Sequence, residues 1–130
     1  MTSFITKRYN TADPFKIAEK LNVKLEWVSM DRSLLGKTQY FMNQPIILLN
    51  TTIRDSNKRY FVLSHELGHV LLHEGLTGYY TVAYHGESKA EAEADNFARS
   101  LLIWTYLDDF GELPDTTDQL TKAYGFEPEH

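Results

Sequence analysis

The sequence predicts an α+β fold, in which a small antiparallel sheet packs on a helical core that carries the functional residues. Three observations lead to this prediction. A helix-opening Asp-Pro pair lies near the N-terminus, short alternating stretches typical of strands follow it, and two later segments have helical periodicity. The 130 residues contain no repeat, low-complexity tract or linker, so we expect residues 1–130 to form a single minimal domain.

The first half of the chain is expected to hold one short helix and three strands. Asp13 is the expected N-cap, and Pro14 the first residue, of a helix that runs to about Leu21. Apolar stretches with strand composition follow at residues 23–28, 36–42 and 46–50. The last two flank residues 43–45 and are expected to pair as an antiparallel hairpin.

Helices are expected to dominate the second half. A long apolar helix is predicted over residues 56–73, with Gly75 as its C-cap. Residues 75–87 include three glycines and three tyrosines, a composition typical of a loop. Further helices are predicted over residues 88–106 and 117–124.

Composition and charge narrow the classes of function. A hydrophobic content of 42% is that of a folded protein, and the absence of cysteine excludes disulfides and thiolate metal ligands. A net charge of −5 without a marked basic run argues against direct nucleic-acid binding. No stretch approaches the roughly 20 apolar residues that span a bilayer, and no signal-peptide core is present. We therefore expect a soluble, cytoplasmic protein that does not bind membranes.

Four ionisable side chains interrupt the apolar stretch at residues 61–73 of the long helix, namely His65, Glu66, His69 and His73. At 100° per residue they occupy one sector about 100° wide, and the other residues of this stretch are apolar or small. The pattern HExxH places two imidazoles on one metal ion and a glutamate beside it that can take a proton from water. His73 lies about another 6 Å along the axis, so packing or hydrogen bonding to a ligand suits it better than ligation. The apolar surroundings argue against exposed surface histidines.

The following helix contains the candidate third ligand. A catalytic zinc usually has three protein ligands, and Glu91 falls within the apolar stripe of this helix, whereas Glu93 falls on its solvated side. Glu91 is therefore favoured, and Asp95, one turn on, is placed to accept an N–H from a ligating imidazole and fix its tautomer. Residues 88–91 also match a capping box, which would explain Glu91 without a metal and stays open as an alternative.

Two motifs taken together resemble the ImmA/IrrE family of metallopeptidases. They are RYFVLSHELGHVLLH at residues 59–73 and EAEADNFA at residues 91–98, followed by a Leu-Leu pair, and the similarity extends over residues 15–105. The resemblance implies a zinc cofactor, with His65, His69 and Glu91 as its ligands and Glu66 as the general base. Family members usually continue the Leu-Leu pair with Met-Pro, and here Ile-Trp stands in that place.

The resemblance also implies a function. Family members are intracellular, and several of them are encoded by phages or mobile elements and relieve repression by cleaving a helix-turn-helix repressor, or by acting on it. We therefore expect a zinc-dependent endopeptidase, cytoplasmic in a bacterial host cell, that cleaves such a repressor. The alternative is a zinc-stabilised anti-repressor that binds the repressor without cutting it. A purely structural zinc site fits less well, because a structural site needs no base.

Two further features are candidates for substrate binding or for stabilising the reaction intermediate. Tyr79, Tyr80, Tyr84 and His85 are candidate donors to an oxyanion, although packing or a surface position is the favoured explanation for each of them. The predicted hairpin could also present an edge strand that aligns an extended peptide by β-augmentation.

Overall fold

The computed structural model describes residues 1–73, 78–81 and 89–125. Within them, helices and a small sheet form an α+β fold, as the sequence predicted. The elements are α1 (Thr2–Tyr9), α2 (Pro14–Lys20), β1 (Lys24–Val28), β2 (Leu34–Phe41), β3 (Gln44–Asn50), the 3-10 turn η1 (Thr51–Ile53), α3 (Lys58–Leu72), β4 (Gly78–Thr81), α4 (Lys89–Phe110) and α5 (Thr117–Tyr124).

The sheet has four strands in the order β1-β3-β2-β4. β2 pairs antiparallel with β3, as predicted, and β4 adds antiparallel to the other side of β2. β1 pairs parallel with β3, so the sheet is mixed and the prediction of an antiparallel sheet was wrong in this respect. The amide of Asn50, at the end of β3, donates to the backbone oxygens of Met30, Asp31 and Leu34 in the β1–β2 connection. These bonds hold the connection across the end of β3, which places β1 on the outer side of that strand.

The hairpin turn differs by two residues from the prediction. Met42 and Asn43 form it with φ values of 51° and 67°, and the following residues Gln44 and Pro45 already belong to β3. Two central residues with positive φ twist in the sense of the flanking strands, which makes this the favoured form of a two-residue hairpin. Both hairpin strands have a neighbour on each side, so within the described ranges the edges of the sheet are β1 and β4. The prediction that the hairpin presents an edge strand was therefore wrong.

Several helix limits also differ. α1 was not predicted, because it buries only Thr2 and Ile5 and so has no clear apolar stripe. α4 continues to Phe110, and β4 lies within a segment that was predicted to be loop. α3 ends at Leu72 with His73 as its C-cap, whereas the predicted cap Gly75 lies outside the described residues.

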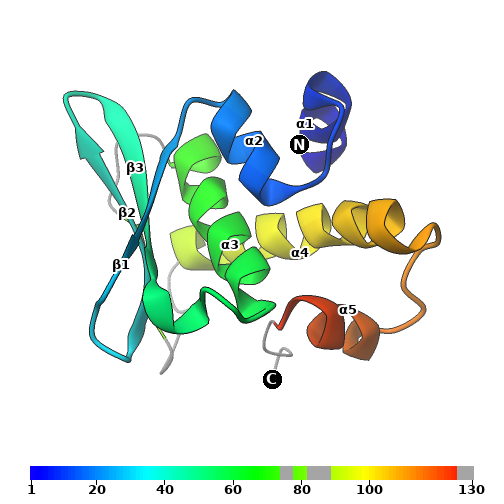
Figure 1. Cartoon of the computed structure of the whole chain (residues 1–130). Coiled ribbons are helices and arrows are strands. Elements are labelled where there is room, and N and C mark those ends of the chain that lie inside the picture. The colour runs from blue at the N-terminus through cyan, green and yellow to red at the C-terminus, as the bar shows by residue number, and fades with distance from the viewer. Residues whose placement is uncertain (74–77, 82–88, 126–130) are drawn as a thin grey trace.

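α3 is the central element of the molecule. Figure 1 shows it lying against the sheet, with α4 crossing behind it, α2 and α1 on one side and α5 on the other. Its side chains meet those of β3 and α4 in the core, where Ile47, Leu49, Phe61, Leu63, Leu67, Leu101 and Leu102 are fully buried. A helix that is apolar nearly all round needs such cover on several faces. No helix in the described ranges is both long and apolar enough to cross a bilayer.

Candidate metal centre

α3 buries its polar stripe together with its apolar faces. His65 and Glu66 are completely buried and His69 is 3% exposed, so all three lie away from bulk water. A ring nitrogen of each histidine and a carboxylate oxygen of Glu66 lie within 4.8 Å of one another. Ionisable groups buried this closely are unfavourable unless hydrogen bonds or a cation compensate for the lost hydration.

A close approach of two helices brings a second set of polar groups to this stripe. A Cβ added at Gly68 would lie 3.1 Å from the Cα of Ala94, so glycine allows α3 and α4 to approach closely here. Glu91 and Asp95 lie on α4 on either side of Ala94, and both contact His65. The small residue between the two histidines therefore decides how near the carboxylates of α4 can come.

Three side chains converge on one point. Glu91 Oε2 lies 3.0 Å from His65 Nε2, and Glu91 Oε1 lies 2.9 Å from His69 Nε2. The two Nε2 atoms are 3.2 Å apart. Ligand atoms about 2.0–2.1 Å from a tetrahedral ion are about 3.3 Å from one another, so each of these three separations is close to the distance between two ligand atoms of a zinc site.

The Nδ1 atoms of the two histidines also have hydrogen-bonding partners. His65 Nδ1 lies 2.6 Å from Asp95 Oδ1, and Asp95 is itself buried. His69 Nδ1 lies 3.1 Å from His73 Nδ1, while His73 Nε2 faces Glu93 Oε1 at 3.6 Å. Each imidazole of the HExxH pair thus has a partner at Nδ1 and turns Nε2 toward Glu91.

Of the two glutamates considered for the third position, Glu91 touches both imidazoles and Glu93 touches His73. The capping-box interpretation of Glu91 involves Ser88, which lies outside the described residues.

Glu66 is held at one oxygen only. Thr38 on β2 donates from Oγ1 to Glu66 Oε2 over 3.1 Å, and both side chains are fully buried. Glu66 Oε1 is buried without a hydrogen-bond partner in the described part of the chain. A buried, unpartnered carboxylate oxygen is rare because it loses its hydration without replacement. This oxygen therefore fits a site that receives a water or another ligand. Thr38 was not singled out from the sequence, because a threonine in a strand gives no signal of its own.

The charges of these groups are strongly coupled. Burial lowers the pKa of His65, but hydrogen bonds to Asp95 and Glu91 outweigh it and raise the pKa to about 9. Burial raises the pKa of Glu91, yet hydrogen bonds from His65 and His69 bring it down to about 2. Burial raises the pKa of Glu66 to about 7, against the opposing charges of the two histidines. Three carboxylates around two imidazoles leave an excess of negative charge, which a divalent cation would balance.

The remaining candidates of the sequence analysis are placed only in part. Tyr84 and His85 lie outside the described residues, and Tyr79 and Tyr80 are described only as backbone of β4.

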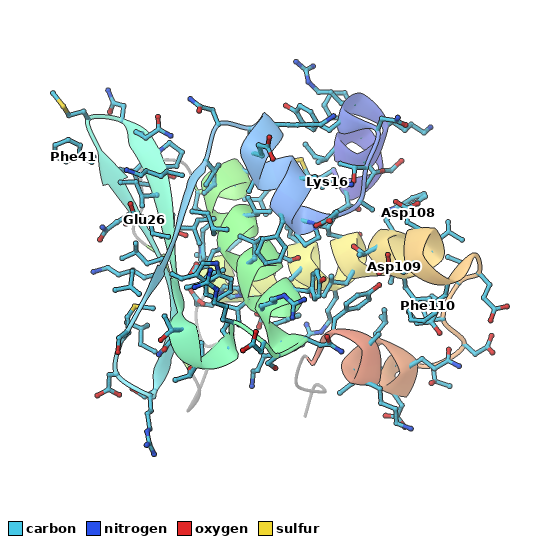
Figure 2. All side chains as sticks on the ribbon, in the orientation of Figure 1. Lys16, Glu26, Phe41, Asp108, Asp109 and Phe110 are labelled. Carbon is cyan, nitrogen blue, oxygen red and sulfur yellow. The ribbon has the colours of Figure 1, made fainter. Side chains whose placement is uncertain are left out.

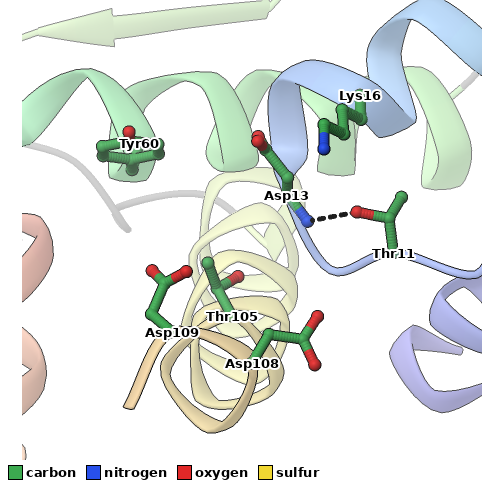
Figure 3. Close-up of a pocket in the computed structure, with 7 residues that line it drawn as sticks. All are labelled: Thr11, Asp13, Lys16, Tyr60, Thr105, Asp108 and Asp109. Carbon is green, nitrogen blue, oxygen red and sulfur yellow. Dashed lines mark hydrogen bonds between the residues drawn. The ribbon is translucent and has the colours of Figure 1, made fainter.

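A separate polar pocket of about 210 Å³ lies where the start of α2 meets the end of α4 (Figure 3). Asp13 in its wall caps α2 through the backbone N–H two residues on. The hydroxyl of Thr105 donates to the backbone oxygen of Ala12, and Asp109 accepts from the hydroxyl of Tyr124. These side chains tie helices together, so we attribute this pocket to packing of the framework.

Comparison with known proteins places the candidate metal centre within a matched region. A family model described as the IrrE N-terminal-like domain, Peptidase_M78, matches residues 18–105, which include all the side chains described around the HExxH histidines. The "Uncharacterized immunity region protein 2" of Bacillus phage phi105 is 29% identical over 101 residues. The match covers 76% of this chain and 63% of the phage protein, so the chain spans less than two thirds of that relative.

Proposed function

The chain belongs to the ImmA/IrrE family, whose peptidase model covers two thirds of it, and on this premise we propose that it is a zinc-dependent peptidase. One observation carries the proposal. The carboxylate of Glu91 reaches Nε2 of both HExxH histidines, and a carboxylate oxygen of Glu66 lies within 4.8 Å of them. A purely structural site would need neither Glu66 nor its unpartnered oxygen.

His65, His69 and Glu91 are the residues that would hold the ion. Two neutral imidazoles and one carboxylate form a known donor set for catalytic zinc, and such sites leave one position open. Thr38 already occupies one oxygen of Glu66, which favours Glu91 over Glu66 as the third ligand. When bound, the zinc supplies a Lewis acid that polarises a carbonyl and acidifies a water.

Glu66 is the proposed general base. Its oxygen Oε1 accepts the proton of the attacking water and then returns this proton to the amine that leaves. The apolar cover of α3 excludes bulk water, which would otherwise compete for that oxygen.

Asp95 and His73 are proposed to orient the ligands. Asp95 accepts the N–H of His65 Nδ1 and so leaves the lone pair of Nε2 directed at the ion. His73 Nδ1 does the same for His69 Nδ1, in the tautomer of His73 that carries its proton on Nε2, the nitrogen that faces Glu93.

We propose a helix-turn-helix repressor of a phage or mobile element as the substrate. The relative in phage phi105 is named for the immunity region of that phage. A peptidase encoded beside its repressor could relieve repression by a single cut.

The experiment incubates the protein with a purified helix-turn-helix repressor from the same phage or mobile element and looks for fragments by mass spectrometry. Zinc-loaded wild type is expected to cut, and Glu66→Gln is expected to keep zinc and lose cleavage. Glu26→Gln on the outer strand β1 makes the same chemical change in an exposed position and should cut like wild type (Figure 2). Cleavage by Glu66→Gln at the wild-type rate would show that the proposed mechanism is wrong.

The same experiment tests sequestration without cleavage. An intact repressor in a stable complex, formed equally by wild type and Glu66→Gln, would replace the peptidase proposal with a zinc-stabilised anti-repressor.

A further inference from the structure

Thr38 contacts the proposed base from an element that carries no part of the HExxH motif. It lies in the middle of β2, paired with Ile47 of β3 on one side and with Gly78 of β4 on the other. Its side chain is fully buried, and its Oγ1 lies 3.1 Å from Glu66 Oε2. β2 is therefore paired with a neighbouring strand on each side at Thr38, the residue whose hydroxyl contacts the carboxylate of Glu66.

We propose that Thr38 is a positioning residue, whose hydroxyl holds one oxygen of Glu66 so that the other oxygen is presented to the attacking water. This inference rests on the proposed peptidase function. A threonine hydroxyl has one proton to donate, and an ionised carboxylate is its strongest available acceptor. The other nearby acceptor, the backbone oxygen of Glu66, lies 3.5 Å away, which is long for a hydroxyl donor. The donor is therefore committed to Oε2, and Oε1 has no hydrogen-bond partner among the residues that the structure describes.

The backbone of β2 restrains the same glutamate at its stem. Gly36 lies two residues from Thr38 and so faces the same side of the sheet. A Cβ added at Gly36 would lie 2.6 Å from Val62 Cγ1 and 3.3 Å from Glu66 Cγ. β2 therefore lies directly against α3 at this level, with the stem of Glu66 packed near Gly36 and its head bonded to Thr38. Because threonine is β-branched, its own χ1 is restricted, and the hydroxyl keeps its direction.

A merely structural role for Thr38 predicts something different. Packing alone would be preserved by valine, which has the same shape without the hydroxyl. Positioning requires the donor and is restored by serine, which keeps the hydroxyl and loses the methyl. The pair Thr38→Val and Thr38→Ser therefore separates the two roles.

The first test measures kcat, KM and zinc affinity for zinc-loaded wild type, Thr38→Val and Thr38→Ser. Thr38→Val is expected to lower kcat by roughly 10- to 100-fold, the value of one hydrogen bond to a charged group. KM and the zinc dissociation constant should stay unchanged, and Thr38→Ser should recover most of kcat. Thr105→Val is the matched control, because it removes another buried, hydrogen-bonded hydroxyl, on α4 well away from the site. It should leave kcat unchanged.

The second test does not depend on activity. Protein labelled with carbon-13 at the glutamate carboxyl group gives a Glu66 resonance that is assigned by its loss in Glu66→Gln. This resonance should move in Thr38→Val and return in Thr38→Ser, with zinc present throughout. An unmoved resonance, or a Thr38→Val enzyme with the kcat of wild type, would overturn the inference. So would a loss of kcat that serine does not recover.

The two tests also separate this inference from the proposed function. If zinc-loaded wild type leaves every repressor intact while the resonance behaves as expected, the peptidase proposal fails and the Thr38–Glu66 bond stands. If wild type cleaves and Thr38→Val cleaves equally well, the positioning role fails and the peptidase proposal stands.

Discussion

The hydrogen bond between Asp95 and His65 gives the sharpest test of how the proposed zinc ligands are held. Asp95 Oδ1 lies 2.6 Å from His65 Nδ1, a distance typical of a short, charge-assisted bond, and Asp95 is only 5% exposed. Asp95→Asn keeps the shape and an oxygen acceptor but removes the charge. Asp95→Ala removes the acceptor and leaves His65 Nδ1 buried without it.

The expected loss of zinc affinity follows from the difference in strength between a charged and a neutral hydrogen bond. A hydrogen bond to a charged group is worth about 1.5–3 kcal/mol and a neutral one about 0.5–1.5 kcal/mol. Asp95→Asn should therefore weaken zinc binding by about 1–1.5 kcal/mol, or roughly tenfold. Asp95→Ala should approach a 100-fold loss, the upper end for residues that support a metal ligand.

The assay is competition for zinc against a fluorescent chelator at fixed pH and ionic strength. Asp109→Asn provides the control, because Asp109 lies on the same helix and accepts a hydrogen bond from Tyr124 at 2.8 Å, remote from the histidines. Its zinc affinity should equal that of wild type. If Asp95→Asn and Asp95→Ala bound zinc as tightly as Asp109→Asn, Asp95 would have no part in holding the ligand and the reasoning would be refuted.

Three further predictions concern stability. Zinc removal by a chelator should lower the melting temperature, since a ligand at 100 times its Kd adds about 2.7 kcal/mol, and Glu91→Gln should abolish most of this difference. Gly68→Val should destabilise the fold by about 1–3 kcal/mol, because the new side chain meets the backbone of Ala94. Urea unfolding of the metal-free protein measures this, and an unchanged midpoint would contradict the close packing. The pKa of Tyr124 is raised above its ordinary value of 10.0 by burial and by its bond to Asp109. The unfolded chain therefore loses this proton first, so stability should fall as pH rises above about 10. Tyr124→Phe should flatten this part of the pH profile, and an identical slope in both proteins would speak against the shift.

Local patterns in the sequence predicted those parts of the fold whose cause is local. α2 has its capping aspartate and first-turn proline, and α5 begins and ends where its periodicity predicted. The HExxH spacing alone brings two imidazoles and a carboxylate to one face of α3, since a helix repeats every 3.6 residues. The apolar stripe of α4 similarly singled out Glu91 over Glu93.

Other features depend on contacts between separate helices and strands, which no local sequence pattern indicates. A strand pattern does not tell whether its neighbour runs parallel, and β1 proved to lie parallel to β3 rather than in an antiparallel sheet. β4 is a four-residue strand in a segment rich in glycine and tyrosine, and only its pairing with β2 makes it a strand. α1 likewise acquires its buried side from contact with α4, including the hydroxyl pair Thr2–Ser100 at 2.7 Å.

The same distinction between local and tertiary causes applies to the candidate metal centre. The sequence by itself determined that His65, Glu66 and His69 share one face, because their relation is set by the geometry of a single helix. The tertiary structure alone decided what surrounds them. Gly68 lets α4 come close enough for Glu91 to bridge both rings, and β2 brings Thr38 to Glu66 across 28 positions of sequence. Contacts between elements depend on how whole surfaces pack, and no spacing within one element encodes them.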